Sequence, residues 1–233
     1  VTDPVKRRPN VLFIAIDDLR PELGTYGTDV ITPNIDRLAT SGVRFDQAYC
    51  QQAVCGASRL SLMSGLYPIR TGEQTFHVSG WRDRHPHVLT MNQHFGQQGY
   101  QTIGLGKIYH GHSGRGVDPE NWGRWVDISA AHYAKPENLE ILARALAQGK
   151  IGDEKDPAKG PLTESADVHD DTYMDGKRAA EATRILEDLA SAQGQPFFLA
   201  VGFAKPHLPF VAPQKYWDMY EREAFTMPPN QAI

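Results

Sequence analysis

Three short apolar runs predict the inner strands of a sheet. Apolar residues and glycine dominate segments 11–16, 101–106 and 196–203. Apolar runs of this length are typical of strands that are buried on both faces, as in a parallel sheet. We therefore predict an α/β fold that is built around these three strands.

Helix signals lie between the apolar runs. Thr32 and Pro33 supply a cap and a first-turn proline to a segment that ends at Gly42. Thr90 and Gln93 have the spacing of a capping box, which predicts a helix to about residue 99.

Residues 170–192 show amphipathic spacing and predict a long helix. Its candidate core residues are Ala179, Ala182, Ile185, Leu186 and Leu189. Residues 43–49 have the pattern of a short strand that leads toward Cys55, whereas residues 111–127 and 149–163 predict loops.

Polar residues follow directly after the predicted strands. Asp17 and Asp18 end the first run, Lys107 and His110 follow the second, and His207 follows the third. The carboxyl ends of strands are where open α/β sheets bind ligands, and adjacent buried carboxylates require a cationic partner. For the aspartate pair considered alone, a solvated turn is the favoured interpretation, and a surface lysine and an ordinary core histidine are the usual roles of Lys107 and His110. A structural histidine held between prolines is the alternative for His207.

Cys55 begins a further helical run, and Arg59 follows it by four residues. The free N–H groups and the dipole of a helix N-terminus favour anions, and the guanidinium group of Arg59 could hold an oxyanion. A nucleophile precursor and an anion-binding site therefore coincide here. The alternative is a buried cysteine on an ordinary helix.

Several motifs together resemble type I sulfatases, and in particular the iduronate-2-sulfatase branch. The signature of that family is matched by Cys55-Gly56-Ala57-Ser58-Arg59, with Gln51-Gln52-Ala53-Val54 before it and Gly65-Leu66-Tyr67-Pro68 after it. Further similar motifs are residues 8–20, Gly106-Lys107-Ile108-Tyr109-His110 and Lys205-Pro206-His207-Leu208-Pro209.

The resemblance implies a fold and a mechanism. The fold is an alkaline phosphatase-like α/β/α sandwich with a central mixed, mostly parallel sheet. In the family the signature cysteine is oxidised to Cα-formylglycine by a maturation enzyme. The hydrated aldehyde attacks sulfur, the alcohol leaves, and collapse of the sulfated hydrate releases sulfate. This resemblance implies that Cys55 is the nucleophile precursor and that Arg59 supports it.

The resemblance also implies a ligand set. Asp17 and Asp18 would bind Ca²⁺ together with the Cys55-derived group, since carboxylates suit a hard cation. Lys107, His110 and His207 would surround the sulfate, and His110 would also hydrogen-bond the nucleophile. The implied substrate is a sulfated saccharide, with a 2-O-sulfated uronic acid as the specific expectation.

Trp81 and Arg82 lie in a predicted loop that also contains His85 and His87. Loop tryptophan and arginine residues often line substrate sites, which makes both residues candidates for substrate binding. A structural role as a loop anchor is an equally good interpretation.

Residues 1–233 resemble the N-terminal part of a sulfatase catalytic domain, about the first half of the family's length. The family also uses a later Asp-His or Asp-Asn pair for the metal and a later lysine for the sulfate, and no matching segment occurs here. We therefore expect that the sequence is a fragment or that a second chain completes the site. The alternatives are a phosphatase or phosphonate monoester hydrolase of the same superfamily, and a non-catalytic carbohydrate-binding remnant.

Composition excludes some partners. The net charge of −4 gives no basic excess for nucleic acid, and no apolar stretch is long enough to predict a membrane span.

Residues 1–4 lack a signal core, so we expect any targeting segment to have been removed or never present. Its removal would imply a periplasmic, secreted or lysosomal-type location. The two cysteines form neither a disulfide scaffold nor a zinc motif.

Overall fold

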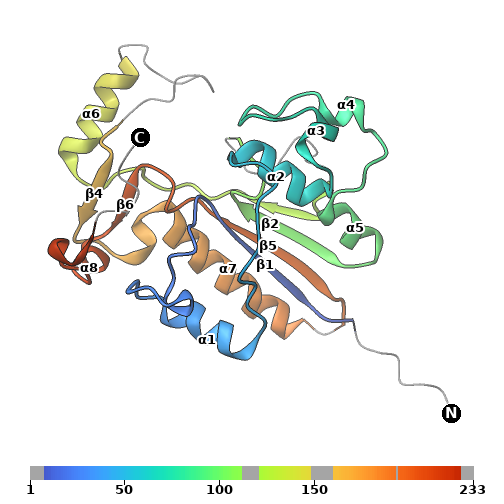
Figure 1. The fold of residues 1–233 in the computed structure, drawn as a ribbon, viewed down its shortest axis with the longest axis horizontal. Helices are drawn as coiled ribbons and strands as arrows, with labels where there is room; N and C mark the ends of the chain where they lie inside the picture. The colour runs from blue at the N-terminus through green and yellow to red at the C-terminus, as the bar shows by residue number, and fades with distance from the viewer. Residues whose placement is uncertain (1–7, 112–120, 148–159, 193, 227–233) are drawn as a thin grey trace. The chain divides into compact units, whose positions relative to one another are not determined.

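The computed structural model describes residues 8–111, 121–147, 160–192 and 194–226 (Figure 1). The chain divides into two compact units. The first unit contains residues 1–128 and 181–207, and the second contains residues 129–180 and 208–233. Among the helices described, none is long and apolar enough to cross a membrane.

A four-stranded parallel sheet forms the centre of the first unit. Its order is β1-β5-β2-β3, and all three pairings are parallel. The strands are β1 (Val11–Ile16), β5 (Phe197–Phe203), β2 (Gln101–Gly106) and β3 (Arg124–Val126). The three apolar runs are therefore confirmed as strands. The prediction that segment 11–16 is an inner strand is wrong for the described sheet, because β1 lies at its edge and Leu12 and Ile14 are 44% and 50% exposed. The strand β3 lies within the segment 111–127 that was predicted as a loop.

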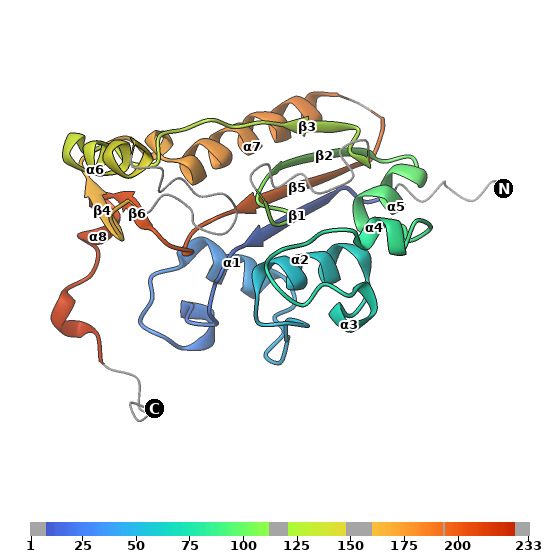
Figure 2. The same cartoon turned by 90° about the horizontal axis from the view of Figure 1, so that it is seen from above.

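Side chains of β5 alternate between two apolar clusters, as strand geometry requires. Phe198 and Ala200 pack in one cluster with Leu60 of α2 (Cys55–Ser64). Leu199 and Val201 pack in the other, with the C-terminal part of α7 (Met174–Ser191). Figure 2 shows α7 on one side of the sheet and α2 on the other. The first unit thus has helices on both faces of its sheet.

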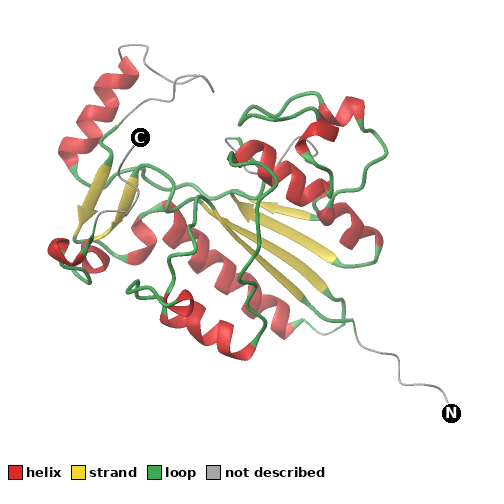
Figure 3. Cartoon of the chain, viewed as in Figure 1, coloured by secondary structure: helices red, strands yellow, loops and turns green. Residues whose placement is uncertain are grey.

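Figure 3 shows the remaining helices of the first unit, in red, outside the yellow strands of the sheet. The predicted helix starts at Thr32-Pro33 and at Thr90 are confirmed, although the Thr32 side chain forms no capping hydrogen bond. The capping box of Thr90 and Gln93 forms both of its hydrogen bonds. These helices are η1 (Gly24–Tyr26), α1 (Pro33–Ser41), α3 (Pro68–Thr71), α4 (Trp81–Arg84) and α5 (Met91–Gln97).

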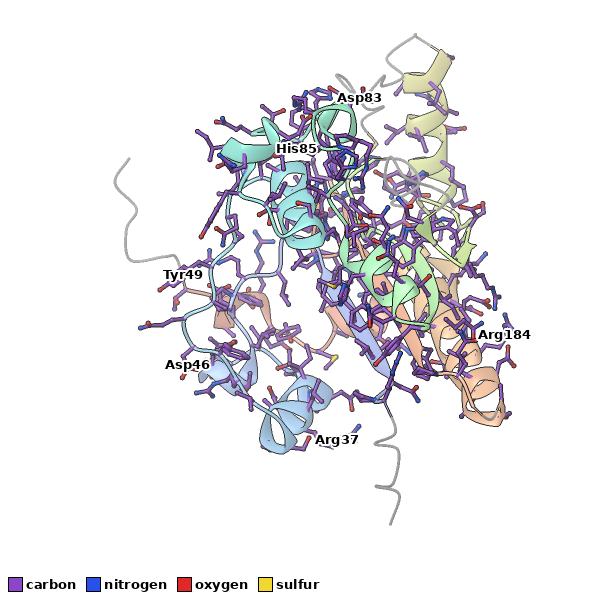
Figure 4. The ribbon with its side chains drawn as sticks, turned by 90° about the vertical axis from the view of Figure 1, so that its right-hand side faces the viewer. Arg37, Asp46, Tyr49, Asp83, His85 and Arg184 are labelled. Carbon is purple, nitrogen blue, oxygen red and sulfur yellow. The ribbon has the colours of Figure 1, made fainter. Side chains whose placement is uncertain are left out.

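The strand predicted for residues 43–49 is wrong, because the segment is an irregular loop. A strand needs a hydrogen-bonded neighbour, and instead Val43 and Phe45 are 80% and 70% exposed. Figure 4 shows Asp46 and Tyr49 projecting outward from this loop.

The core prediction for Ala179 is also wrong, since Ala179 is exposed. Of the other predicted core residues of α7, Ala182 and Ile185 are buried and Leu186 and Leu189 are partly buried.

The second unit contains a small parallel pair of strands with its own apolar cluster. Tyr133, Ala166, Tyr173 and Val211 form that cluster. Much of the predicted loop 149–163 lies outside the described residues. The elements are α6 (Pro136–Ala147), β4 (Thr163–Ala166), η3 (Asp170–Thr172), the first residues of α7, β6 (Phe210–Pro213), α8 (Gln214–Trp217) and η4 (Arg222–Ala224).

Glu164 of β4 is a buried carboxylate that joins several parts of the second unit. It accepts hydrogen bonds from the N–H groups of Ala134 and Lys135, at 2.6 and 3.2 Å. It also accepts from the Asn138 amide at 2.6 Å and from the Tyr173 hydroxyl at 2.7 Å. Burial alone would raise the pKa of Glu164, but these donors outweigh burial and lower it. The ionised form is therefore the one that the fold stabilises.

We predict that Glu164→Gln lowers the free energy of unfolding at pH 7 by about 2 kcal/mol or more, because an amide cannot accept all of these hydrogen bonds. A lowered pKa in the folded state means that the charge stabilises the fold at neutral pH. This contribution decreases as the pH falls below the ordinary glutamate value of about 4.3. Urea unfolding at pH 7 and in acid should therefore show a smaller difference between wild type and variant in acid. Glu140→Gln is the control, because the Glu140 side chain is 70% exposed.

Candidate functional site

The predicted metal ligands lie where β1 ends. The N–H of Asp17 donates to the carbonyl of Phe203 at 3.1 Å, which holds the turn against the end of β5. Asp18 has φ of 55°, in the left-handed region that aspartate tolerates better than most residues. The two neighbouring carboxylates differ in exposure, since the Asp17 side chain is 4% exposed and the Asp18 side chain 55%.

Two cations neutralise the buried Asp17. Arg59 donates to Oδ1 of Asp17 from Nε at 3.1 Å and from Nη2 at 2.9 Å. The Lys107 ammonium group hydrogen-bonds the other oxygen, Oδ2. Burial would raise the pKa of Asp17, but the hydrogen bond from Lys107 and the charge of Arg59 outweigh burial and lower it. Asp17 is thus held as a carboxylate between two positive side chains.

Arg59 ties the helix α2 to the end of β2. Its side chain is only 7% exposed. Besides binding Asp17, its Nη1 donates to the carbonyl of Ile108 at 3.1 Å and to the carbonyl of Lys107. The first turn of α2 is therefore fixed to the residues that follow both β1 and β2.

Cys55 and His110 are in direct contact. Cys55 is the first residue of α2, and its Sγ lies 3.2 Å from Nδ1 of His110. Both side chains are partly buried. The N–H of Ala57, in the same first turn, already donates to the carbonyl of Thr75 at 3.1 Å. The helix N-terminus therefore offers an anion fewer free donors than the sequence pattern predicts.

Gly202 is a residue of this site that the sequence analysis did not identify. A Cβ on Gly202 would lie 2.1 Å from the carbonyl carbon and oxygen of Lys107. The Lys107 N–H in turn donates to the Gly202 carbonyl at 2.8 Å. Glycine is thus needed for the main chain of Lys107 to approach β5. The only signal in the sequence is a glycine near the end of an apolar run.

Asp17, Asp18 and His207 form a group that could hold a metal ion. One potential ligand atom from each lies within 4.8 Å of the others. Nε2 of His207 lies 3.9 Å from Oδ2 of Asp18. The two carboxylates suit Ca²⁺, whereas the imidazole nitrogen is not a typical calcium ligand. Because Ca²⁺ takes about six to eight oxygen atoms, the aspartates fit part of a calcium site and further oxygen ligands are required.

Trp81 and Arg82 make mainly internal contacts. The Trp81 side chain is buried in the core with 1% exposure. Arg82 lies over its indole ring at 4.2 Å and donates to the carbonyls of His85 and Val88 at 3.2 and 2.7 Å. The predicted loop is wrong at these two residues, because they begin the short helix α4. Their contacts are those of a structural anchor, one of the two interpretations that the sequence left open. Their contact with substrate stays a prediction.

Comparisons with known proteins agree with the motifs. The family model described as Sulfatase matches residues 9–231. Iduronate 2-sulfatase of Mus musculus is 36% identical over 96% of this chain and 40% of its own length. A protein named Sulfatase from Formosa agariphila is 33% identical over 97% of this chain and 44% of its own length. The chain thus spans about two fifths of the length of these curated relatives.

Solved structures have a similar fold. Ps i-CgsB in complex with k-i-k-neocarrahexaose has a TM-score of 0.63 and 26% identity, over 86% of this chain and 46% of that chain. The phosphonate monoester hydrolase of Agrobacterium radiobacter has a TM-score of 0.61 and 23% identity, over 92% of this chain and 44% of that chain. At 23% identity, the comparison with the phosphonate monoester hydrolase shows similarity of the fold alone.

Proposed function

Because the chain belongs to the sulfatase family, which has the alkaline phosphatase-like fold, we propose that it provides the nucleophile-bearing part of a sulfatase active site. The proposed reaction is hydrolysis of a sulfate ester on a saccharide, with 2-O-sulfated uronic acid as the specific substrate. The observation that carries this proposal is the contact between Cys55 and His110 beside the Asp17–Arg59–Lys107 cluster. The identity to mouse iduronate 2-sulfatase supports the substrate assignment.

In this proposal some polar side chains act on the nucleophile and others bind the sulfate. Converted to formylglycine, Cys55 would supply a hydrated aldehyde as the nucleophile. Nδ1 of His110 is within reach of that group and can hold or transfer a proton there. Arg59 keeps the first turn of α2 in place, and Lys107 and His207 would bind sulfate oxygens.

Asp17 and Asp18 are the proposed calcium ligands in this chain. Bound Ca²⁺ would stabilise the charge that develops on the sulfate oxygens. Since two aspartates cannot complete such a site, we propose that residues 1–233 form the N-terminal part of a catalytic domain. The missing ligands would come from a further segment or a second chain, consistent with the share of the relatives that is matched.

A maturation enzyme and a cellular compartment are also part of the proposal. Formylglycine requires an enzyme that recognises the Cys55 motif. A periplasmic, secreted or lysosomal-type location stays a prediction. A phosphatase or phosphonate hydrolase is the alternative activity, since one structural neighbour with this fold is a phosphonate monoester hydrolase.

We predict that the active protein carries formylglycine at Cys55 and that Cys55→Ala abolishes sulfate-ester hydrolysis. Peptide mass spectrometry of the complete protein, produced together with the maturation enzyme, measures the conversion. Cys50 is the internal control, because it is an exposed thiol without the following motif and should stay a cysteine.

Two outcomes would contradict this proposal. Fully active protein with an unmodified Cys55 would exclude the formylglycine mechanism. Turnover of phosphate or phosphonate esters well above that of sulfate esters would favour the alternative activity on the same fold.

A further inference from the structure

Phe76 lies against the first turn of the nucleophile helix. It belongs to the segment between α3 and α4. A Cβ on Gly56 would lie 2.3 Å from the carbonyl oxygen of Phe76, so the two main chains are in close contact. The neighbouring Thr75 carbonyl accepts the N–H of Ala57 at 3.1 Å. The backbone of Phe76 is thus fixed relative to Cys55.

The ring of Phe76 is next to the imidazole that contacts Cys55. The rings of Phe76 and His110 meet edge to face, with centroids 6.1 Å apart and an interplanar angle of 67°. The ring of His77 packs against Phe76 at 4.1 Å. Phe76 nevertheless stays 40% exposed. An apolar surface is therefore open to solvent close to the proposed nucleophile.

This position matches the part of a sulfated sugar that the charged residues do not recognise. Lys107, Arg59 and His207 can bind or support the anionic sulfate group. None of them distinguishes between the different saccharides to which that sulfate could be esterified. Ligand sites commonly combine a few placed polar groups with an aromatic surface. One face of a pyranose ring consists of C–H groups and fits such a surface.

We infer that Phe76 is a specificity-determining residue that contacts the apolar face of the sugar ring whose sulfate lies at Cys55. This inference rests on the proposed function. It assigns recognition of the saccharide to Phe76 and recognition of the sulfate to the charged cluster. The anchored backbone keeps the ring in place before substrate binds, which reduces the entropy lost on binding.

Equilibrium binding to the complete protein tests the inference. Cys55 is left as a cysteine, so that no turnover occurs. The probes are a disaccharide with a 2-O-sulfated uronic acid and inorganic sulfate. Phe76→Ala should weaken disaccharide binding about 3- to 10-fold, the range expected for one aromatic contact, and leave sulfate binding unchanged. Phe76→Tyr retains the ring and should bind the disaccharide like wild type.

The other outcomes overturn the inference in distinguishable ways. Equal weakening of both probes by Phe76→Ala would mean that Phe76 acts only by positioning His110. Unchanged binding of the disaccharide would exclude the contact. Wild-type protein that binds sulfate but not the disaccharide would contradict a saccharide substrate and the role of Phe76 together. Wild-type protein that binds neither probe would contradict the proposed function itself.

Discussion

Asp17→Asn should both destabilise the first unit and remove activity. The Asp17 side chain is 4% exposed, and its partners Arg59 and Lys107 are 7% and 15% exposed. Removal of the carboxylate charge that lies between the two cations leaves the buried Arg59 and the partly buried Lys107 without this ionic partner and mutually repulsive. Breaking a buried ion pair in this way costs about 3–5 kcal/mol. Urea unfolding at neutral pH measures this loss, and calcium titration of the folded protein measures the proposed metal role.

Asp18→Asn is the matched control for this experiment. The Asp18 side chain is 55% exposed, and its ionic neighbour His207 lies 3.9 Å away. We expect the free energy of unfolding to change by less than about 0.5 kcal/mol, as for most surface substitutions. Calcium affinity should decrease in both variants, because each loses a carboxylate ligand.

The pair of variants separates a structural role from a metal-binding role. If Asp17→Asn retains wild-type stability, the ion-pair cluster does not hold the unit together. If both variants retain wild-type calcium affinity in the complete protein, the metal assignment of Asp17 and Asp18 is wrong.

The positions of the strands, and the convergence of the site residues at one edge of the sheet, can be predicted from features of the sequence. Segments 101–106 and 196–203 are apolar because they supply β2 and β5, the inner strands of the described sheet, which are buried on both faces. Segment 11–16 is equally apolar, yet it supplies an edge strand of that sheet, and Leu12 and Ile14 are 44% and 50% exposed. Parallel strands end at the same edge of the sheet, so Asp17, Lys107 and the loop that carries His207 converge there. The hydrophobic pattern of the sequence and the parallel topology of the sheet are together sufficient to predict that these residues lie close together.

Other features depended on contacts that no local pattern displays. Residues 43–49 have a strand-like composition, but they form an irregular loop that pairs with none of the described strands. Trp81 and Arg82 have the composition of a binding loop, yet they contact core side chains and carbonyl groups. Glu164 is one acidic residue among many in the sequence, and its importance arises from donors between 9 and 30 residues away.

The role of Gly202 likewise depends on tertiary contacts, and its substitution is the second change for which we expect a large effect on activity. Gly202→Ala would place a methyl group 2.1 Å from the carbonyl carbon of Lys107 and 2.5 Å from its nitrogen. Main-chain atoms cannot move aside as a flexible side chain can, so the Lys107 segment must shift. That segment carries the ammonium group that binds Asp17 and a carbonyl that accepts from Arg59.

We expect Gly202→Ala to lower kcat/KM by about 100-fold, the effect of a displacement of about 1 Å at an active site. The free energy of unfolding should fall by about 1–3 kcal/mol, as for other overpacked sites. Steady-state kinetics with a sulfate ester and urea unfolding of the same preparation measure both effects.

Gly96→Ala is the control for the added methyl group. A Cβ on Gly96 would make only an ordinary contact, 3.8 Å from a methyl group of Thr102, and alanine is favoured over glycine within the helix α5. That variant should keep wild-type kcat/KM and should not lose stability. If Gly202→Ala behaves in the same way, Lys107 does not require the close approach to β5, and its position is set by the ion pair with Asp17 instead.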